Sequence, residues 1–446
     1  MPNIAEGLGV FVWEYAENGR RANIRVEKIL PSGWNCVIIK LYMCVLVAEA
    51  VPLHKTEYLF GGFMKDILYG DLGIIGMQGC ERFTAQVDNY IREWRGSSES
   101  FLVGAECPRF GSGEAKGLIS RSVRGLDLFI ICDIFNYGVT YKMRGKPHEM
   151  SPDDHYADLK RIVGAVEGKA RRISVIMPML YEGRQHKRTS RESLDCAMML
   201  RELETIGVRN LITFDAHDDR VQNVVPFMGF DNYRPTYQMV KALVRVIPDI
   251  EFSKDKLIII SPDEGAMGRC MYFSSVLGLD VGMFYKRRDY SRVEGGRNPI
   301  VAHEYLGSDL TGMDVIIVDD MISSGESLFD VARQIKSRGA KRIFSFATFG
   351  LFTNGIECFD SAFEEGILDK VFTTNLIYTD PEIKSREWYV EVNMSKYVSY
   401  IIDTLNHDES ISLILDPVKK IHALLEKHKA ETDAQQLSIF GAANKQ

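Results

Sequence analysis

Short apolar runs alternate with segments of helical periodicity along most of the chain. Residues 315–318 form a continuous β-branched run, which predicts a buried strand rather than an amphipathic helix. Residues 326–338 then place apolar side chains three or four positions apart, as a helix does. Alternating strands and helices imply mostly parallel sheets with helices on both faces. The same pattern predicts further strands at 126–132, 173–177, 210–214, 257–260, 280–285 and 342–347, and further helices at 83–94, 158–166, 192–206, 234–246 and 265–277.

The pattern restarts after Pro226, which indicates two α/β domains, at residues 64–226 and 227–390. We expect residues 391–446 to form a C-terminal helical segment and tail, part of which belongs with the first domain. Residues 135–155 are polar and contain several glycines and prolines, which predicts a long loop.

The first 63 residues fit neither domain. Two glycine codons and a phenylalanine codon directly before Met64 can spell a purine-rich ribosome-binding sequence. Our hypothesis is that the natural chain starts at Met64 and that residues 1–63 are translated leader. Mass spectrometry of the native protein tests this, since a tryptic peptide from within residues 21–55 would contradict it.

The composition is that of an ordinary globular protein, with 46% of the 446 residues apolar and 26% charged. The net charge of −7 argues against nucleic acid as a partner, because that partner needs a basic face. The eight cysteines show no CxxC spacing and no clustering with histidine, so we expect reduced thiols in a cytoplasmic protein. The longest apolar stretch, at 37–50, contains Lys40 and is shorter than the ~20 residues of a membrane span, so we expect no membrane partner.

Polar side chains follow the β-branched run. The carboxylates of Asp319 and Asp320 come first, and a short loop with Ser323, Ser324 and Gly325 leads into the next helix. Ligands sit outside the carboxyl ends of strands in open α/β sheets. A loop that opens a helix offers N–H groups and hydroxyls to a phosphate, and paired acids suit sugar hydroxyls, directly or through a bound cation. The loop therefore suits both ends of a ribose 5-phosphate, although paired acids also occur where they only cap a turn.

Four other polar clusters also follow predicted strands. His217 is flanked by acids, Asp263 precedes glycines that open a helix, and residues 184–188 and 286–297 are basic loops. Each has an ordinary explanation when taken alone: a structural histidine, a helix N-cap or a solvated charge run. The second basic loop could instead close over a polyphosphate and stabilise its developing charge. All of the clusters fall at the ligand edge of a sheet, which favours a shared site.

Taken in order, these clusters and one earlier block resemble the ribose-phosphate diphosphokinase family, whose members make phosphoribosyl diphosphate (PRPP). The resemblance covers about residues 106–415. Any one block would be weak, but six blocks in the correct order are specific. They are RFGSGE at 109–114, PMLYEGRQHKR at 178–188, FDAHDDRVQ at 214–222, SPDEGAMGR at 261–269, YKRR at 285–288 and VDDMISSGES at 318–327.

The resemblance implies two domains of the phosphoribosyltransferase type, each with a mostly parallel sheet flanked by helices. It implies a cytoplasmic enzyme with Mg²⁺ as cofactor and with ATP and ribose 5-phosphate bound between the domains. A neighbouring subunit contributes to the nucleotide site in this family, which implies a homo-oligomer built from dimers, with a hexamer as one form. The implied reaction moves the diphosphoryl group of Mg-ATP to the C1 hydroxyl of ribose 5-phosphate and gives PRPP and AMP.

The resemblance also implies roles residue by residue. The catalytic pair is Lys286 and Arg288, and the magnesium-linked pair is His217 and Asp263. The implied ATP contacts are Phe110, Ser112, Gly113, Glu114, Arg184 and Gln185. The implied ribose 5-phosphate contacts are Arg288, Asp319, Asp320, Ser323, Ser324, Gly325, Glu326 and Ser327.

Several positions depart from the family pattern. The family usually has Asp where Ser112 and His186 stand, and Asp-Thr-Gly-Gly-Thr at 323–327. Glu326 adds a negative charge beside a phosphate site, which is unfavourable unless the side chain turns outward. The loop at 135–155 is longer than usual. Two other functions stay open: a catalytically weak or silent regulatory partner subunit, which the departures favour, and a PRPP-using phosphoribosyltransferase, which the second basic loop opposes.

Overall fold

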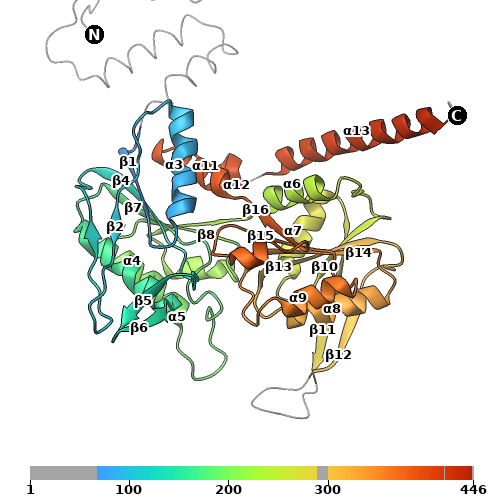
Figure 1. The fold of residues 1–446 in the computed structure, drawn as a ribbon, viewed down its shortest axis with the longest axis horizontal. Coiled ribbons are helices and arrows are strands. Elements are labelled where there is room, and N and C mark those ends of the chain that lie inside the picture. The colour runs from blue at the N-terminus through green and yellow to red at the C-terminus, as the bar shows by residue number, and fades with distance from the viewer. Residues whose placement is uncertain (1–67, 289–299, 416, 444–446) are drawn as a thin grey trace, which may run out of the picture. The chain divides into compact units, whose positions relative to one another are not determined.

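The structure is a computed structural model that describes residues 68–288, 300–415 and 417–443. The proposed start at Met64, the leader before it, and Arg292 and Arg297 lie outside the described residues. The predicted fold class is confirmed, because mostly parallel sheets flanked by helices form the described part of the chain (Figure 1). None of the described helices is both long and apolar enough to cross a membrane.

Five parallel strands form the N-terminal sheet, in the order β1-β4-β7-β8-β9. The strands are β1 (Asp71–Gly76), β4 (Leu126–Ile131), β7 (Arg172–Ile176), β8 (Asn210–Phe214) and β9 (Gly229–Tyr233). The helices of this half are α3 (Glu81–Arg95), α4 (Pro152–Val166) and α5 (Asp195–Thr205), with a 3₁₀ helix at Asp219–Val224. Two short strands pair with each other outside the sheet, β2 (Ala105–Glu106) and β3 (Leu118–Ile119).

Seven strands form the C-terminal sheet, in the order β12-β11-β10-β13-β14-β15-β16, and only the pair β11-β12 is antiparallel. The strands are β10 (Leu257–Ser261), β11 (Asp280–Arg288), β12 (Ile300–Leu306), β13 (Asp314–Ile322), β14 (Arg342–Gly350), β15 (Lys370–Thr374) and β16 (Tyr389–Val392). The helices of this half are α6 (Thr236–Val246), α7 (Met267–Leu277), α8 (Glu326–Ser337), α9 (Glu357–Glu364) and α10 (Pro381–Lys384).

The apolar run in β13 shows why it forms a strand. Successive side chains of a strand point to opposite faces of the sheet. Ile316 and Val318 belong to one core cluster, and Val315 and Ile317 belong to another. All four are at most 1% exposed. Both faces are therefore covered, so an unbroken apolar run is stable where a half-exposed strand would alternate with polar residues.

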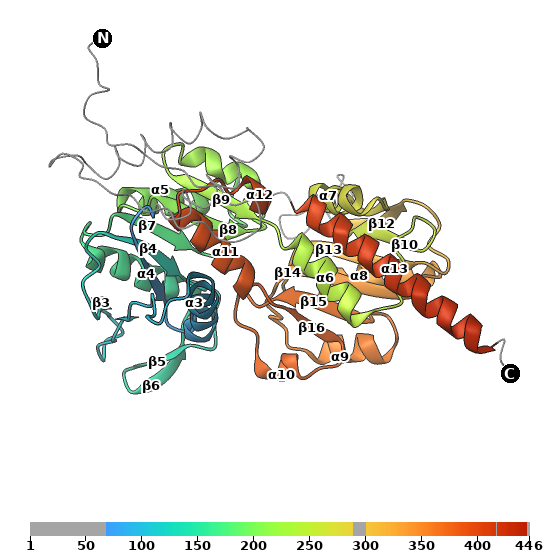
Figure 2. The ribbon, with the colours of Figure 1, turned by 90° about the horizontal axis from the view of Figure 1, so that it is seen from above.

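The chain returns to the N-terminal half after the second sheet. α11 (Ser395–Asn406) packs against α3, and two views at right angles place these helices side by side (Figures 1 and 2). Asn406 Nδ2 donates a hydrogen bond of 2.9 Å to Asp127 Oδ2 in β4. After the short α12 (Ser412–Leu415), α13 (Val418–Ala443) packs against α6 and α7 (Figure 2). The C-terminal segment thus contacts both halves.

The prediction of a long loop at 135–155 is wrong. A hairpin of β5 (Thr140–Met143) and β6 (Lys146–Glu149) fills its middle, and α4 begins already at Pro152. A proline at the first helical position and the capping box of Ser151 start this helix. The hairpin has no apolar period of its own, so the sequence pattern does not reveal it, although its two strands pair over four residues.

The prediction of a loop directly after residue 285 is also wrong. β11 continues to Arg288 and pairs antiparallel with β12, with an irregularity between Arg287 and Arg288. The apolar run ends earlier than the strand, because an antiparallel pair at the edge of a sheet does not need burial on both faces. The other predicted strands and helices are present, with ends shifted by a few residues.

Candidate active site

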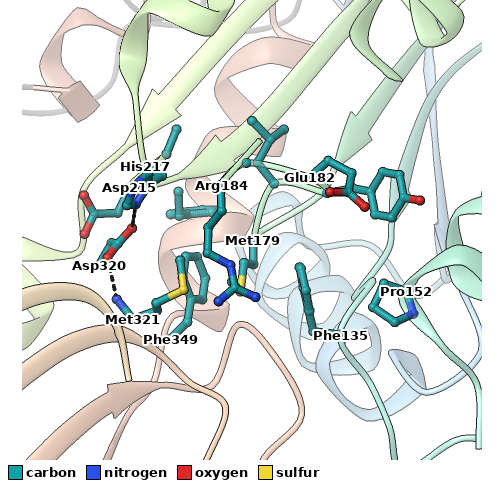
Figure 3. A pocket seen from close by; sticks show the side chains of 15 residues that line it. Phe135, Pro152, Met179, Glu182, Arg184, Asp215, His217, Asp320, Met321 and Phe349 are labelled. Atoms are coloured by element: carbon teal, nitrogen blue, oxygen red, sulfur yellow. Dashed lines mark hydrogen bonds and ion pairs between the residues drawn. The ribbon is translucent and has the colours of Figure 1, made fainter. Parts of the chain in front are cut away.

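A cavity of about 170 Å³ lies where the carboxyl ends of β8 and β13 come together. The segment after β8 contributes His217, and β13 contributes Asp320 (Figure 3). The charged or ionisable lining side chains are Tyr181, Glu182, Arg184, Asp215, His217 and Asp320. The larger apolar ones are Phe135, Met179, Leu180, Phe214, Met321 and Phe349. Polar groups from two sheets therefore converge on one small space, as expected for a ligand site at strand ends.

His217 and Asp320 join the two sheets beside this cavity. Nδ1 of His217 donates a hydrogen bond of 2.6 Å to Oδ2 of Asp320. This hydrogen bond raises the pKa of His217, and burial opposes it. Burial would raise the pKa of Asp320, but the hydrogen bond from His217 and the charge of Arg269 outweigh it and lower the pKa to about 2. Asp320 is therefore ionised at neutral pH and accepts hydrogen bonds.

Arg269, Asp215 and Thr348 have no role in the sequence-based assignment, yet they form a polar network beside Asp320. Arg269 Nε donates to Asp215 Oδ1 at 2.9 Å, and Thr348 Oγ1 donates to Asp215 Oδ2 at 2.7 Å. The sequence carries only a weak signal of this network. Arg269 closes one conspicuous block and Asp215 opens another, but no local pattern shows that residues 54 positions apart form a pair.

Residues 323–327 lead from β13 into the N-terminus of α8, next to the two acids. Gly325 has a φ of +88°, and a Cβ there would stand 2.7 Å from the Phe359 ring and 2.8 Å from the Phe329 ring, so glycine is required. The N-cap residue Gly325 makes no side-chain cap, and the Glu326 N–H forms only a long hydrogen bond of 3.5 Å to Ser324 Oγ, so other N–H groups of the first turn remain available to an anion. The Glu326 side chain is exposed, so solvent screens its charge.

His217 and Asp263 are the magnesium-linked residues of the sequence-based assignment. No three His, Cys, Asp or Glu side chains gather closely enough to hold a metal ion within the described ranges. His217 uses Nδ1 toward Asp320, which leaves Nε2, and Asp263 Oδ1 accepts the N–H of Ala266 at 3.1 Å. Mg²⁺ prefers oxygen and is usually held by one or two carboxylates together with substrate phosphates. The residues present therefore fit an ion that arrives with a polyphosphate, and Asp263 suits it better than imidazole does.

The side chains of the neighbours Arg184 and Gln185 have different surroundings. Arg184 is exposed and extends into the cavity (Figure 3). Gln185 Nε2 donates to the carbonyl oxygen of Ser193 at 3.0 Å and to Glu192 Oε2 at 3.3 Å, and it does not line the cavity. Arg184 is thus the member of the pair that reaches the cavity, and the segment before α5 holds Gln185.

The block at 109–114 lies outside the cavity. Phe110 is 53% exposed, although it is a large apolar side chain. Ser112 Oγ donates a hydrogen bond of 2.8 Å to Glu114 Oε2. Within a single chain, therefore, the implied adenine-side contacts do not lie at the cavity that Arg184 lines. These contacts are Phe110, Ser112, Gly113 and Glu114.

The β5-β6 hairpin packs against this block. The Arg109 guanidinium lies 4.6 Å from the centroid of the Tyr141 ring, and Arg109 also forms a 2.8 Å ion pair with Asp158. A Cβ at Gly113, whose φ is +99°, would stand 2.7 Å from Met143 Sδ. The segment expected to be a loop is thus a support for the implied adenine-side residues.

Lys286 and Arg288 lie in β11, where their backbones pair with His303 and Ile300 of β12. β11 runs parallel to β10, and its residue Met283 pairs with the last residue of β10. Residues 286–288 therefore extend past the carboxyl edge of the sheet, on the side from which Asp263 also emerges. The catalytic role of this pair stays a prediction.

The side chain of His186 is directed toward Asp218. Its Nε2 lies 3.4 Å from Asp218 Oδ2, its ring centroid lies 5.3 Å from that of His217, and it does not line the cavity. A direct effect of His186 on bound phosphates requires a side chain that faces the cavity. The structure does not have that arrangement.

Three family models match consecutive parts of the chain. The N-terminal domain of ribose phosphate pyrophosphokinase matches residues 72–207. The phosphoribosyl transferase domain matches residues 231–353, and the phosphoribosyl synthetase-associated domain matches residues 297–416. Together the three models cover most of the chain.

Curated relatives and a solved structure agree with these models. A ribose-phosphate pyrophosphokinase of Vibrio parahaemolyticus is 27% identical over 320 residues, which are 71% of this chain and 92% of that protein. One of Haemophilus ducreyi is 29% identical over 322 residues, with the same coverage of 71% and 92%. The crystal structure of phosphoribosylpyrophosphate synthetase from Mycobacterium smegmatis shares the fold, with a TM-score of 0.62 over 76% of this chain and 99% of that one, at 19% identity. The chain belongs to the ribose-phosphate pyrophosphokinase family.

Proposed function

We propose that this protein is a ribose-phosphate diphosphokinase, which transfers the diphosphoryl group of Mg-ATP to the C1 hydroxyl of ribose 5-phosphate. The arrangement at the end of β13 is the observation that carries the proposal. Asp319 and Asp320 offer acceptors to sugar hydroxyls, and residues 323–327 with the N-terminus of α8 offer donors to the 5-phosphate. His217, which follows β8 of the other sheet, donates a hydrogen bond of 2.6 Å from Nδ1 to Oδ2 of Asp320.

The reaction is an in-line displacement at phosphorus. The C1 hydroxyl oxygen forms a bond to the β-phosphorus of ATP, and the bond from that phosphorus to the oxygen bridging the α-phosphate breaks. AMP leaves with the bridging oxygen, and the hydroxyl proton passes to solvent. Mg²⁺, when bound with ATP, neutralises charge on the phosphate oxygens. The work of the protein is to position both substrates and to offset negative charge.

The residues of the chain divide this work between them. Arg184 extends into the cavity and is placed to bind the polyphosphate. Lys286 and Arg288, at the carboxyl end of β11, would neutralise charge on the diphosphoryl group as it moves. Asp320 is ionised and oriented by His217, so it can fix a sugar hydroxyl in one direction. None of these roles requires a covalent intermediate on the protein.

A second copy of the chain would complete the nucleotide site. The block at 109–114 does not reach the cavity of its own chain, and Phe110 is exposed. This supports a homo-oligomer built from dimers. Mixing inactive Glu114→Ala subunits with inactive Lys286→Ala subunits tests it: shared sites restore part of the activity, and sites made within one chain restore none.

Incubation of the pure protein with Mg-ATP and ribose 5-phosphate tests the function. We expect AMP and PRPP in equal amounts, with formation that stops when EDTA removes the metal or when ribose 5-phosphate is omitted. Lys286→Ala should be inactive, and Lys420→Ala, which removes a charge at an exposed position of α13, should match the wild type. Mass spectrometry identifies both products.

The same assay separates the two other functions. A silent regulatory subunit binds ATP but forms no AMP. A PRPP-using phosphoribosyltransferase releases diphosphate from PRPP only when a base is present. The match of residues 72–207 to the N-terminal domain of ribose phosphate pyrophosphokinase argues against this last function.

A further inference from the structure

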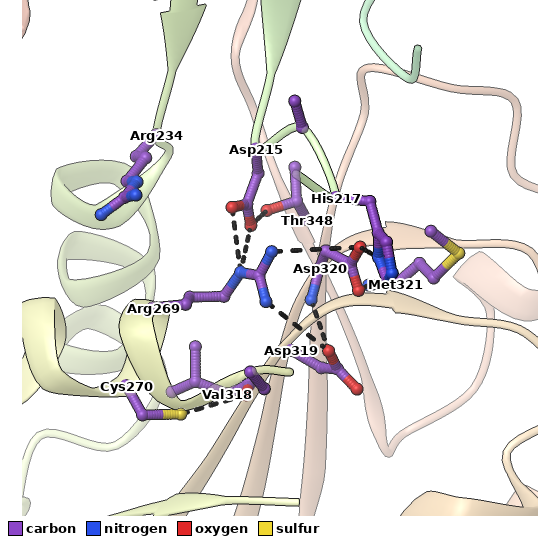
Figure 4. Close-up of polar contacts among 12 residues, drawn as sticks. Asp215, His217, Arg234, Arg269, Cys270, Val318, Asp319, Asp320, Met321 and Thr348 are labelled. Carbon is purple, nitrogen blue, oxygen red and sulfur yellow. Dashed lines mark hydrogen bonds and ion pairs between the residues drawn. The ribbon is translucent and has the colours of Figure 1, made fainter. Parts of the chain in front are cut away.

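A buried guanidinium lies among three carboxylates at the centre of the site. Arg269 Nε donates to both carboxylate oxygens of Asp215 at 2.9 Å (Figure 4). Its two terminal nitrogens form longer ion pairs, at 3.8 Å to Asp319 Oδ1 and 3.9 Å to Asp320 Oδ2. The Arg269 side chain is 10% exposed. One planar side chain thus faces three acids that come from two sheets.

Asp215 is fully engaged in holding this arginine. Thr348 Oγ1 donates to Asp215 Oδ2 at 2.7 Å, and the Asp215 N–H donates to the carbonyl oxygen of Tyr233 at 2.8 Å. The backbone of Asp215 has a φ of +43°, in the left-handed region that residues other than glycine rarely adopt. The surrounding contacts must hold this conformation in place. Asp215 therefore serves as the anchor of Arg269.

Arg269 lies behind the acids rather than in the cavity. It is not one of the described residues that line the cavity, whereas Asp320 lines it and Asp319 is 37% exposed. An effect of Arg269 on a bound sugar would therefore pass through the carboxylates with which it pairs. Adjacent carboxylates repel each other, and burial together with the charge of Asp320 raises the pKa of Asp319 well above its ordinary value. The charge of Arg269 opposes this rise and also favours the ionised form of Asp320.

We propose that Arg269 is a positioning residue for ribose 5-phosphate. Its guanidinium holds Asp319 and Asp320 in the orientation that accepts the sugar hydroxyls, and it ties them to Asp215 at the end of β8. This inference rests on the proposed function, because it assumes that the two acids bind the sugar. An ion pair with a purely structural role requires one carboxylate, whereas the planar guanidinium of Arg269 faces three carboxylates with its three nitrogens.

Arg269→Lys tests the need for the fork, because it keeps the charge but offers one compact ammonium group. We expect the Kd of ribose 5-phosphate, measured by calorimetry, to rise at least about tenfold, with the Kd of Mg-ATP changed by less than about threefold. Arg234→Lys is the matched control. Arg234 pairs with Asp219 at 3.4 Å and stacks on Tyr272, outside this network, so both Kd values should stay at the wild-type level.

Thr348→Val is a second variant in case Arg269→Lys folds poorly. It has nearly the same shape and removes only the hydroxyl that fixes Asp215. We expect ribose 5-phosphate to bind about two- to fivefold more weakly, with unchanged binding of Mg-ATP. Circular dichroism and the melting temperature show whether each variant is folded. Equal weakening for both ligands in folded variants would make the network merely structural and overturn the proposal.

A double-mutant cycle with Asp319→Asn tests whether Arg269 acts through the acids. If it does, adding Arg269→Lys to the Asp319→Asn variant should raise the Kd of ribose 5-phosphate by less than about a further twofold. If the rise in Kd of the double variant equals the product of the rises in the two single variants, Arg269 acts independently of Asp319, and the proposal would fall.

A separate measurement of AMP formation keeps this inference distinct from the proposed function. If the wild type forms no AMP but binds ribose 5-phosphate, and Arg269→Lys weakens that binding, the enzymatic function fails and the positioning role stands. If AMP forms but Arg269→Lys leaves the ribose 5-phosphate Kd and KM unchanged, the positioning role fails alone. A wild type that does not bind ribose 5-phosphate overturns both.

Discussion

The backbone N–H of Tyr378 donates a hydrogen bond of 2.6 Å to Oδ2 of Asp133, which joins the segment after β15 to the segment after β4. Oδ1 of the same carboxyl group accepts the N–H of Phe135 at 3.0 Å. The Asp133 residue is only 4% exposed. A buried carboxyl group, held by two backbone donors, thus links the two halves of the described chain.

This carboxyl group should make stability depend on pH. Burial raises the pKa of Asp133 from 3.8 to about 7, although its two N–H donors act in the opposite direction. Between these values the folded state holds a proton that the unfolded state has released. The stabilisation is complete below the unfolded pKa and is lost as the pH rises through about 7. We expect the free energy of unfolding to fall across this window, by at most ~1.4 kcal/mol per pH unit from this group.

Urea unfolding of the wild type and of Asp133→Asn, measured from about pH 5 to about pH 7.5, checks this expectation. Asparagine does not titrate, so the decline of the unfolding free energy with pH should be shallower in the variant. Asp309→Asn replaces an exposed acid and should leave the decline as in the wild type. Equal slopes in wild type and Asp133→Asn would show that the carboxyl group does not titrate in this window.

Lys286→Ala should abolish PRPP formation with little loss of stability. The residue lies near the end of β11, beside the edge strand β12, and its proposed action is on charge that develops in the transition state. We expect kcat to fall at least ~10²-fold, the scale for removing one electrostatic stabiliser. Steady-state kinetics and the melting temperature measure the two effects. A fall in kcat of less than about tenfold would mean that Lys286 is not the catalytic lysine.

Combined replacement of Asp319 and Asp320 by asparagine should raise the KM of ribose 5-phosphate far more than that of ATP. These acids occupy the strand end beside the proposed sugar site, whereas Arg184, which lines the same cavity from the segment after β7, is proposed to bind the polyphosphate. Initial rates with each substrate varied in turn give both constants. Asp330→Asn, on the exposed face of α8, is the control and should change neither. Equal rises in both KM values would contradict the placement of the sugar.

Ser112→Asp should increase the preference for ATP over GTP. A carboxylate accepts a hydrogen bond from the adenine 6-amino group more strongly than a hydroxyl does, and it repels the guanine carbonyl at that position. We expect the ATP/GTP ratio of kcat/KM to rise at least about threefold. Ser122→Asp, which adds the same charge at another exposed serine, should leave the ratio unchanged. An unchanged ratio in Ser112→Asp would make this departure functionally neutral.

His186→Asp should affect stability rather than ATP binding. The imidazole lies 3.4 Å from Asp218 and is mostly buried, so a carboxylate there would face a like charge. We expect the melting temperature of His186→Asp to fall by roughly 2–4 °C for each kcal/mol of unfolding free energy that is lost. The melting temperature of the neutral variant His186→Asn should fall less. Thermal unfolding and ATP titrations check both parts. A changed pH dependence of ATP binding in His186→Asn would instead place the ring near the phosphates.

The sequence by itself determined those strands and helices whose pattern of apolar residues follows directly from which of their faces are buried. The run at 315–318 is apolar at every position because helices cover both faces of β13. The acids after it, His217, and the hydroxyls and glycine before α8 stand at strand ends, and parallel strands bring their carboxyl ends to one edge. The α/β class and the gathering of these residues at strand ends could therefore be predicted without coordinates, and the role of these residues in binding a sugar stays a prediction.

Only the tertiary structure decided features that depend on partners remote in sequence. The β5-β6 hairpin is polar and is held through Arg109 and Tyr141, so no local period marks it as a strand pair. The end of β11 is a strand because β12 pairs with it. The network of Arg269 joins side chains up to 133 positions apart, and the direction of the Arg269 side chain follows from the packing of α7 against β10, β11 and β13. A hydrophobic pattern records how deeply each residue is buried, but it does not record which polar group lies opposite.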